Sequence, residues 1–339
     1  MVRFDDGELE IAIATYNRPD FIKGWLEKCY RQAVERNIAL SIYDSSPDDK
    51  TERIILDFNK NAEFKVKYRH VDSKTIIGYK PMFPILESDF QYLWVSGDAR
   101  YNDFEQLDEK VFPYIKNRKA DYIVINVSNN RQFPDMLFDN CGDMIHAVFI
   151  PSTCIGLSIY RMEIFDPIRN NRNLLNEYDK KFKDNYGFSW LGYFYNVYAA
   201  GKYYTLLANV NTYPVLDIRK TEAWVKQFYG CWADDLCQII DNIPDVYTGK
   251  DFIPRETWDI MRLYSIPYCY LARKNGDLDK KKYDEIKKNG KLDKICDKHS
   301  RIRFFAISPM IMVEFVFKIY AVLDYSKRAC RKIIRLIRR

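Results

Sequence analysis

Short apolar runs alternate with amphipathic segments through the first third of the chain. The runs at residues 9–14 (LEIAIA), 39–44 (ALSIYD) and 92–96 (YLWVS) are typical of buried strands, and residues 64–70 (FKVKYRH) alternate as a further strand. After the first run, Pro19 stands near a helix start and apolar residues recur at helical spacing from Phe21 to Cys29. Residues 45–59 open with Ser, Pro and Asp, which favour the start of a second helix. Such strand–helix–strand units predict parallel pairing with right-handed crossovers.

Residues 78–89 are expected to form a broken helical piece, and the pattern becomes mixed from residue 101 onward. There we expect a helix at 104–117, a strand at 121–128 and an irregular loop at 129–144. Residues 145–165 read as a strand, a turn and then a short strand or helix, with a broken helix or helix pair at 176–201 and a strand-like run at 203–217. The chain beyond is mainly helical. The pattern therefore predicts an α/β domain over residues 1–217 and a helical extension over 218–300.

Polar residues gather where the predicted strands end. The four ends read ATYNR, YDSSPDD, RHVDSK and SGDAR, and in open parallel sheets ligands bind beyond the carboxyl ends of the strands. A dinucleotide dehydrogenase needs G-x-G-x-x-G after its first strand, but that place reads ATYNRPD. A phosphate-binding G-x-x-x-x-G-K-[ST] loop is also absent from the sequence. The sequence therefore predicts a nucleotide-type site that belongs to neither of these classes.

Three of these segments together resemble a known family. IAIATYNRPDFI, SIYDSS and FQYLWVSGDAR, in this order and spacing, resemble the family-2 type of GT-A glycosyltransferases. The resemblance covers residues 8–105 well, extends weakly to about residue 215 and does not reach the residues past 250. It implies a GT-A fold, which is a Rossmann-like mixed sheet, here followed by the C-terminal helical extension. It also implies an inverting transfer from a nucleotide sugar, most simply a UDP-linked one.

The resemblance implies roles for residues on the nucleotide side of the site. Asp44 stands where the family holds the uracil or ribose, while Thr15, Tyr16 and Arg18 line the base side. Lys80 is placed to meet the diphosphate. The plain alternatives are a turn-forming role for Asp44 and an ordinary solvated position for Lys80.

Asp98, which follows Gly97, matches the first carboxylate of the family's DxD motif. By the resemblance it holds a divalent cation, Mn²⁺ or Mg²⁺, against the diphosphate, and one carboxylate plus substrate phosphates can suffice for Mg²⁺. The sequence departs from the motif because Arg100 stands where the second acid belongs. Its guanidinium could bind the diphosphate and replace part of the metal charge, or it could pair with Asp103 or Glu105.

An inverting transferase also needs a general base. The family supplies an acid near a late helix start, but the sequence has no clean Glu-Asp pair there. Asp184 in DNYG is the first candidate and Asp143 in CGDM is the second. Each could equally be a surface acid or a helix cap. His146 could ligate a metal, but a packed residue of a strand is the simpler interpretation.

The basic charge of the protein is concentrated at its C-terminal end. Residues 301–339 hold ten Lys or Arg against two acids, a net charge of +8, so the remaining 300 residues carry −2 of the total of +6. The segment 301–325 is apolar but interrupted by Pro309, Glu314 and Lys318, which argues against a spanning helix. Residues 326–339 place apolar and basic residues on different helical faces. We therefore expect 301–339 to be a basic amphipathic tail lying on an anionic membrane surface. A helix packed on the protein is the alternative, and nucleic-acid binding is disfavoured because the body lacks positive charge.

Composition limits the remaining possibilities. The eight cysteines form no CxxC pair, there are only three histidines, and no apolar leader precedes the first charges. We therefore expect reduced thiols, no His-rich metal site and a cytoplasmic protein peripheral to the inner face of the cell membrane. The 26 tyrosines are expected mostly as packing residues, although aromatic faces also suit sugars.

Together these features predict an inverting glycosyltransferase of surface polysaccharide synthesis, such as capsule assembly. Its partners would be a nucleotide sugar, a glycan or lipid-linked acceptor and the membrane surface, without nucleic acid, and the helical extension could support a homodimer. Two alternatives remain. One is a nucleotidyl or sugar-phosphate transferase, which would need a glycine-rich basic loop after the first strand. The other is a catalytically degenerate protein, marked by Arg100, that binds glycans or acts as a scaffold for another transferase.

Overall fold

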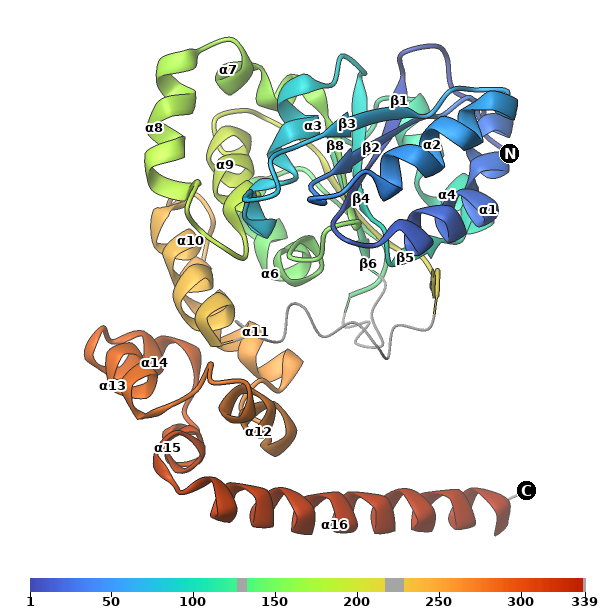
Figure 1. Ribbon diagram of the computed structural model, residues 1–339. Coiled ribbons are helices and arrows are strands. Elements are labelled where there is room, and N and C mark those ends of the chain that lie inside the picture. Colours follow the sequence, from blue (N-terminus) through green and yellow to red (C-terminus); the bar gives the residue numbers. More distant parts are fainter. Residues whose placement is uncertain (127–132, 217–228, 338–339) are drawn as a thin grey trace. The chain divides into compact units, whose positions relative to one another are not determined.

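The computed structural model describes residues 1–126, 133–216 and 229–337, with side chains up to Tyr325 (Figure 1). It divides into two compact units, each treated separately below. The first comprises Met1–Thr221 with Gln238–Ile253, and the second comprises Glu222–Cys237 with Pro254–Arg339.

The first unit is built on an eight-stranded mixed sheet in the order β3-β2-β1-β4-β8-β6-β9-β7. Strands β1, β2, β3 and β4 pair in parallel, as do β6 and β9, while β8 runs antiparallel between β4 and β6 and β7 is antiparallel at the edge. The strand bounds are β1 Leu9–Thr15, β2 Ala39–Asp44, β3 Lys67–His70, β4 Tyr92–Gly97, β6 Tyr122–Asn126, β7 Met136–Phe138, β8 Ser158–Arg161 and β9 Thr205–Asn209; a separate ribbon pairs β5 Arg100–Asn102 with β10 Thr212–Pro214. The predicted α/β fold with a mixed sheet and a C-terminal helical region is confirmed.

One face of the sheet is covered by helices from the first half of the chain. Residues of alternate strand positions, such as Ile11 and Trp94, join one apolar cluster with Trp25 of α1 and Leu107 of α4, because successive strand side chains point to opposite faces. The helices are α1 Pro19–Glu35, α2 Lys50–Asn61, α4 Phe104–Lys110 and α5 Phe112–Lys116, and the first three are labelled in Figure 1.

The other face is packed largely with aromatic rings. Tyr122 and Tyr160 from neighbouring strands stack at 5.2 Å, and Phe194 of α9 contacts both. Each of these rings is buried, so several of the abundant tyrosines are core residues, as expected. The remaining helices named here are α3 Met82–Glu87, α6 Cys141–Ser152, α7 Asp166–Arg169, α8 Arg172–Phe182, α9 Ser189–Tyr198 and α10 Leu236–Asn242.

Helix α6 corrects one prediction. The run IHAVFI was expected as a strand, but it is helical, and His146 therefore lies on a helix. The side chain of Asn140 caps the helix by accepting from the backbone N–H of Asp143 at 2.9 Å, and the buried residues include Met144, Ile145 and Val148, spaced as on one helix face. A short apolar run does not distinguish a buried helix from a buried strand, and here the cap decides.

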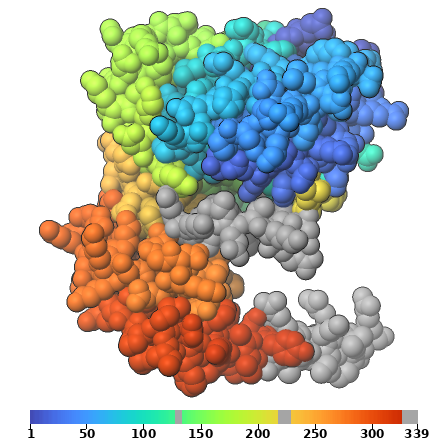
Figure 2. Space-filling view, viewed as in Figure 1, coloured from blue at the N-terminus to red at the C-terminus, as the bar shows by residue number. Residues whose placement is uncertain are grey.

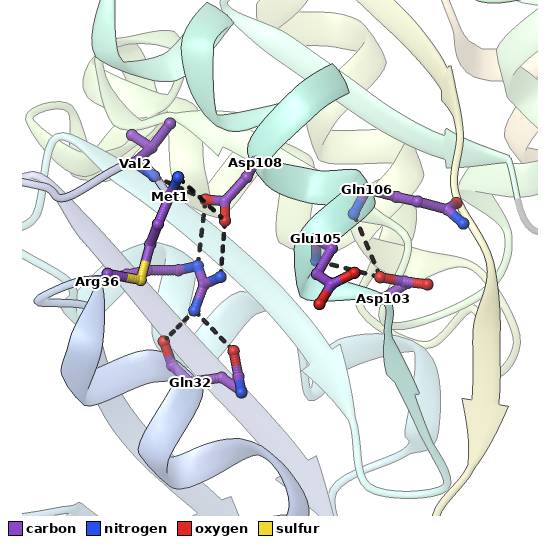
Figure 3. Close-up of polar contacts among 8 residues, drawn as sticks. All are labelled: Met1, Val2, Gln32, Arg36, Asp103, Glu105, Gln106 and Asp108. Atoms are coloured by element: carbon purple, nitrogen blue, oxygen red, sulfur yellow. Dashed lines mark hydrogen bonds and ion pairs between the residues drawn. The ribbon is translucent and has the colours of Figure 1, made fainter.

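A buried ion pair ties α1 to α4. Arg36, at the C-terminal end of α1, is 3% exposed. Its guanidinium donates to Asp108 at 2.7 Å and also to the carbonyl and side chain of Gln32 (Figure 3). Asp103 begins α4 by accepting from two backbone N–H groups. These contacts fix the helix that directly follows β5, the strand carrying Arg100.

The second unit is helical and ends in one long helix. Its helices are α11 Ile253–Met261, α12 Ile266–Lys274, α13 Lys280–Lys288, α14 Lys291–Ile295, α15 His299–Ile307 and α16 Met310–Ile337, preceded by a π-helix at Gly230–Asp235. The Phe317 ring of α16 stacks on Tyr270 of α12 at 3.9 Å, and Val313 is fully buried. The basic side chains predicted for the tail from Lys327 onward lie outside the described residues.

Helix α16 leaves a broad apolar face uncovered within the second unit. Its exposed members, at 45–78% exposure, are Ile311, Met312, Phe315, Ile319, Val322, Leu323 and Tyr325, and Figure 2 shows the helix (red) at the surface. No helix among the described residues is long and apolar enough to cross a membrane.

Seven cysteines have described side chains, and none of these seven is joined to another in a disulfide. Four of them are buried, and the reduced state stays a prediction.

Candidate functional site

The three sequence segments of the family resemblance meet at one edge of the sheet. Thr15 pairs with Asp44 at the ends of β1 and β2, and Ala14 pairs with Gly97 at the end of β4. The chain turns sharply after β1 at Asn17, which has a φ of +53°, a conformation that Asn adopts more readily than most residues. The fold therefore brings the polar strand ends together, as the sequence predicts.

Asp98 is the centre of this edge. It is 5% exposed, and each of its oxygens accepts a hydrogen bond: Oδ2 from the Thr15 hydroxyl at 2.7 Å and Oδ1 from the Arg18 guanidinium at 3.0 Å. Burial raises the pKa of Asp98, while the charge of Arg18 opposes that rise. Arg18, placed on the base side by the sequence, is thus ion-paired with Asp98.

Lys80 supplies an unpaired buried cation next to this pair. It is 9% exposed, and its ammonium lies 4.6 Å from the centre of the Tyr16 ring. Within residues 1–126, 133–216 and 229–325, the ammonium has no hydrogen-bond or ion-pair partner. Burial lowers the pKa of Lys80 to about 8, against the opposing charges of Asp98 and Asp44. A buried charge without a partner is costly, so this ammonium is suited to an anionic ligand.

Tyr16 covers Lys80 and remains 44% exposed. An exposed ring beside two cations offers a stacking surface for a base and positive charge for phosphates. This arrangement is complementary to a nucleoside diphosphate.

Asp44 is fully buried in a hydrogen-bonded turn. Its Oδ1 accepts from the backbone N–H and hydroxyl of Ser46, at 2.9 and 2.5 Å, and its Oδ2 accepts from the Tyr68 hydroxyl at 3.2 Å. The Ser46 hydroxyl also accepts from the backbone N–H of Asn17 at 2.8 Å. Asp44 therefore stabilises the turn that follows β2 at this edge of the sheet. Sequence reasoning missed Ser46 and Tyr68; the Asp-Ser-Ser run after β2 signalled the turn, but only the fold brings Tyr68 of β3 to it.

Arg100 makes neither of the two hydrogen bonds that Asp98 accepts. It is exposed on β5, and its Nε donates to the Thr212 hydroxyl at 3.3 Å. Asp103, considered above as its partner, instead caps α4 and accepts from Tyr213.

The residues at this edge fit a divalent cation poorly. Asp98 is the one predicted metal ligand, and both of its oxygens already accept from protein donors. In the part of the chain that the structure describes, no three His, Cys, Asp or Glu side chains are grouped to hold a metal ion. Arg18 and Lys80, whose charges act on Asp98, are cations, and the carboxylate of Asp44 also acts on Lys80 but accepts from Ser46 and Tyr68.

The two candidate bases lie in different places. Asp184 is exposed in the turn before α9, and in that turn the carbonyl of Tyr186 accepts from the backbone N–H of Gly78, two residues before Lys80, at 2.8 Å. A Cβ at Gly78 would lie 2.7 Å from that carbonyl oxygen, so the turn and the Lys80 segment are in close contact. Asp143 lies in the first turn of α6, where its carboxylate accepts from Asn140.

His146 is on the same helix as Asp143. Its Nε2 atom lies 3.0 Å from the carbonyl oxygen of Thr248. This contact ties α6 to the segment that follows α10.

Comparison with solved structures finds similar chains, among them TarS and a mannosyltransferase. No family model and no curated protein matches the chain. Residues 1–349 of S. aureus TarS are similar at 14% identity, over 79% of this chain and 80% of that one, with a TM-score of 0.45; the complex of the same fragment with UDP-GlcNAc gives 13%, the same coverage and 0.44. The mannosyltransferase PcManGT from Pyrobaculum calidifontis, in complex with GDP-Man and Mn²⁺, is similar at 11% identity over 86% of both chains, with a TM-score of 0.49.

Proposed function

We propose that this chain is a glycosyltransferase of the GT-A type that takes a sugar from a nucleotide sugar at the carboxyl edge of its sheet. The observation that carries the proposal is the unpaired, buried ammonium of Lys80 beneath the exposed Tyr16 ring, next to Arg18. The three sequence segments that resemble the family converge on the same edge. The ring would stack on the base, and the two cations would face the phosphates.

The donor is proposed to be UDP-linked, as the family resemblance implies. Asp44, where the resemblance places the ribose or uracil, would act through the turn that it holds, because its carboxylate is fully buried and accepts from Ser46 and Tyr68. Thr15, Gly97 and Arg100 would border the sugar and phosphates.

The reaction is proposed to be an inverting single displacement. The acceptor hydroxyl oxygen bonds to the anomeric carbon, the bond from that carbon to the phosphate oxygen breaks, and the leaving nucleoside diphosphate keeps the electron pair. Asp184 would take the hydroxyl proton, since its turn touches the segment carrying Lys80, and Asp143 is the second candidate. The acceptor would be a glycan or lipid-linked glycan in surface polysaccharide synthesis.

The tail from residue 301 to 339 is proposed to hold the enzyme on the cytoplasmic membrane surface. The uncovered apolar face of α16 and the basic residues that follow in sequence are the two features of an in-plane amphipathic helix. Residues 1–217 would then be the catalytic domain and 218–300 a connecting extension.

The test is release of nucleoside diphosphate from UDP-sugars and GDP-sugars, with and without glycan acceptors. Acceptor-dependent release that Tyr16→Ala and Lys80→Ala both abolish supports the proposal. No binding of any nucleotide sugar would refute it.

One observation favours a second function, that of a binding partner without transfer. Helix α9 begins with Ser189 and Trp190, both buried, so no acid stands at this late helix start. Tight nucleotide-sugar binding with no hydrolysis or transfer would select this alternative.

A further inference from the structure

The carboxylate expected to bind metal already serves the protein itself. Both oxygens of Asp98 accept hydrogen bonds of ordinary length, from the Thr15 hydroxyl at 2.7 Å and from the Arg18 guanidinium at 3.0 Å. Asp98 is almost fully buried, and its side chain is 7% exposed against 26% for Arg18. A cation would have to share this carboxylate with the charge-assisted bond to Arg18, in a poorly solvated place where a further charge is costly to bury.

The second position of the DxD motif supplies no further carboxylate to a metal ion, because it is Arg100. Arg100 is two residues further on, exposed and hydrogen-bonded to Thr212. A divalent cation beside Asp98 would therefore have one carboxylate and would be repelled by the nearby charges of Arg18 and Lys80.

The same side chains form a good phosphate site. The guanidinium of Arg18 has five N–H donors and is fixed on one side by Asp98, and its exposed part remains accessible. The ammonium of Lys80 is held over Tyr16 and is unpaired among the described residues. Two cations on separate segments, after β1 and before α3, can each meet one phosphate of a diphosphate.

We propose that this site binds the donor diphosphate without a divalent cation, through Arg18 and Lys80. Asp98 is then a positioning residue that orients the Arg18 guanidinium, and the two side-chain cations stabilise the negative charge of the leaving nucleoside diphosphate. The inference rests on the proposed function, because it requires that a nucleotide bind at this edge.

The test is calorimetric titration of the full chain with UDP and with GDP, in EDTA and then in Mn²⁺ or Mg²⁺. We expect affinity in EDTA within about threefold of that with metal, because the protein supplies the positive charge. Arg18→Ala and Lys80→Ala should each weaken binding in EDTA by about 10- to 100-fold, the usual loss of a hydrogen bond to a charged group. Lys74→Ala, an exposed lysine upstream on the same segment, is the control and should bind as the parent protein does.

Two substitutions at Asp98 separate positioning from metal ligation. Asp98→Asn keeps an acceptor oxygen for Arg18 but loses the charge and should weaken binding only about threefold, whereas Asp98→Ala releases the guanidinium and should lose about tenfold. Thermal unfolding of each variant checks that it is folded. Binding that disappears in EDTA and in Asp98→Asn would overturn the metal-free site while leaving the proposed function intact. Absence of binding under every condition would refute the proposed function itself.

Discussion

The ammonium of Lys80 gives the site a pH dependence that can be worked out in advance. Burial lowers the pKa of Lys80 to about 8, so the free protein loses this positive charge as the pH rises through that value. A diphosphate binds the charged form better, which means that binding and protonation are linked. We therefore predict that the affinity for a UDP-sugar falls above about pH 8.

The size of the effect follows from the fraction of Lys80 that is protonated. With a pKa of about 8, roughly nine-tenths of the ammonium is charged at about pH 7 and roughly one-tenth at about pH 9. If only the charged form contacts the phosphate, the affinity should drop about tenfold between these conditions, which corresponds to about 1.4 kcal/mol. A UDP-sugar is the right ligand because its diphosphate, esterified at both ends, keeps its charge over this range.

The measurement is calorimetry of the parent, Lys80→Arg and Lys80→Ala at several pH values between about 7 and 9.5. Arginine keeps its charge over this range, so Lys80→Arg should bind with a nearly flat profile, and Lys80→Ala should bind weakly and also flatly. The other groups around the ammonium, the Tyr16 ring, Arg18, Asp44 and Asp98, are unchanged in both variants. An unchanged parent affinity up to pH 9, or the same fall in Lys80→Arg, would refute the reasoning.

Four further predictions test the fold and the proposed roles. Gly78→Ala places a Cβ 2.7 Å from backbone carbonyl oxygens of the turn before α9; denaturant unfolding should show a loss of about 1–3 kcal/mol, and an unchanged midpoint would contradict this packing. Arg36→Ala removes the buried partner of an ion pair and should cost about 3–5 kcal/mol, while Arg31→Ala, which breaks an exposed pair, should cost about 0.5 kcal/mol or less; equal losses would argue against the buried pair. Asp184→Asn should lower the transfer rate at least about 100-fold with unchanged nucleotide affinity, and full activity would exclude Asp184 as the base. Phe315→Glu on the uncovered face of α16 should reduce sedimentation with anionic vesicles, and undiminished binding would place the membrane contact elsewhere.

Local patterns identified most of the elements of the first unit. The runs 9–14, 39–44 and 92–96 are strands because their apolar, β-prone residues are buried in a sheet. The helix starting at Pro19 was equally clear. The run 145–150 was not, since its residues fit either a buried strand or a buried helix, and the cap at Asn140 lies outside the run. Strand order across β4, β8 and β6 depends on long-range pairing, which no local pattern specifies.

The sequence by itself determined which polar groups stand at the strand ends and that the basic charge belongs to the tail. It could do so because strand ends and charge blocks are properties of contiguous residues. The tertiary structure decided which side chains are in contact: Arg18 pairs with Asp98 rather than with a base, and Tyr68 bonds to Asp44. It also placed Lys80 against Tyr16, with no hydrogen-bond or ion-pair partner among the described residues. These contacts join residues up to 80 positions apart, and their geometry and burial, which set the charge balance of the site, exist only once the sheet has assembled.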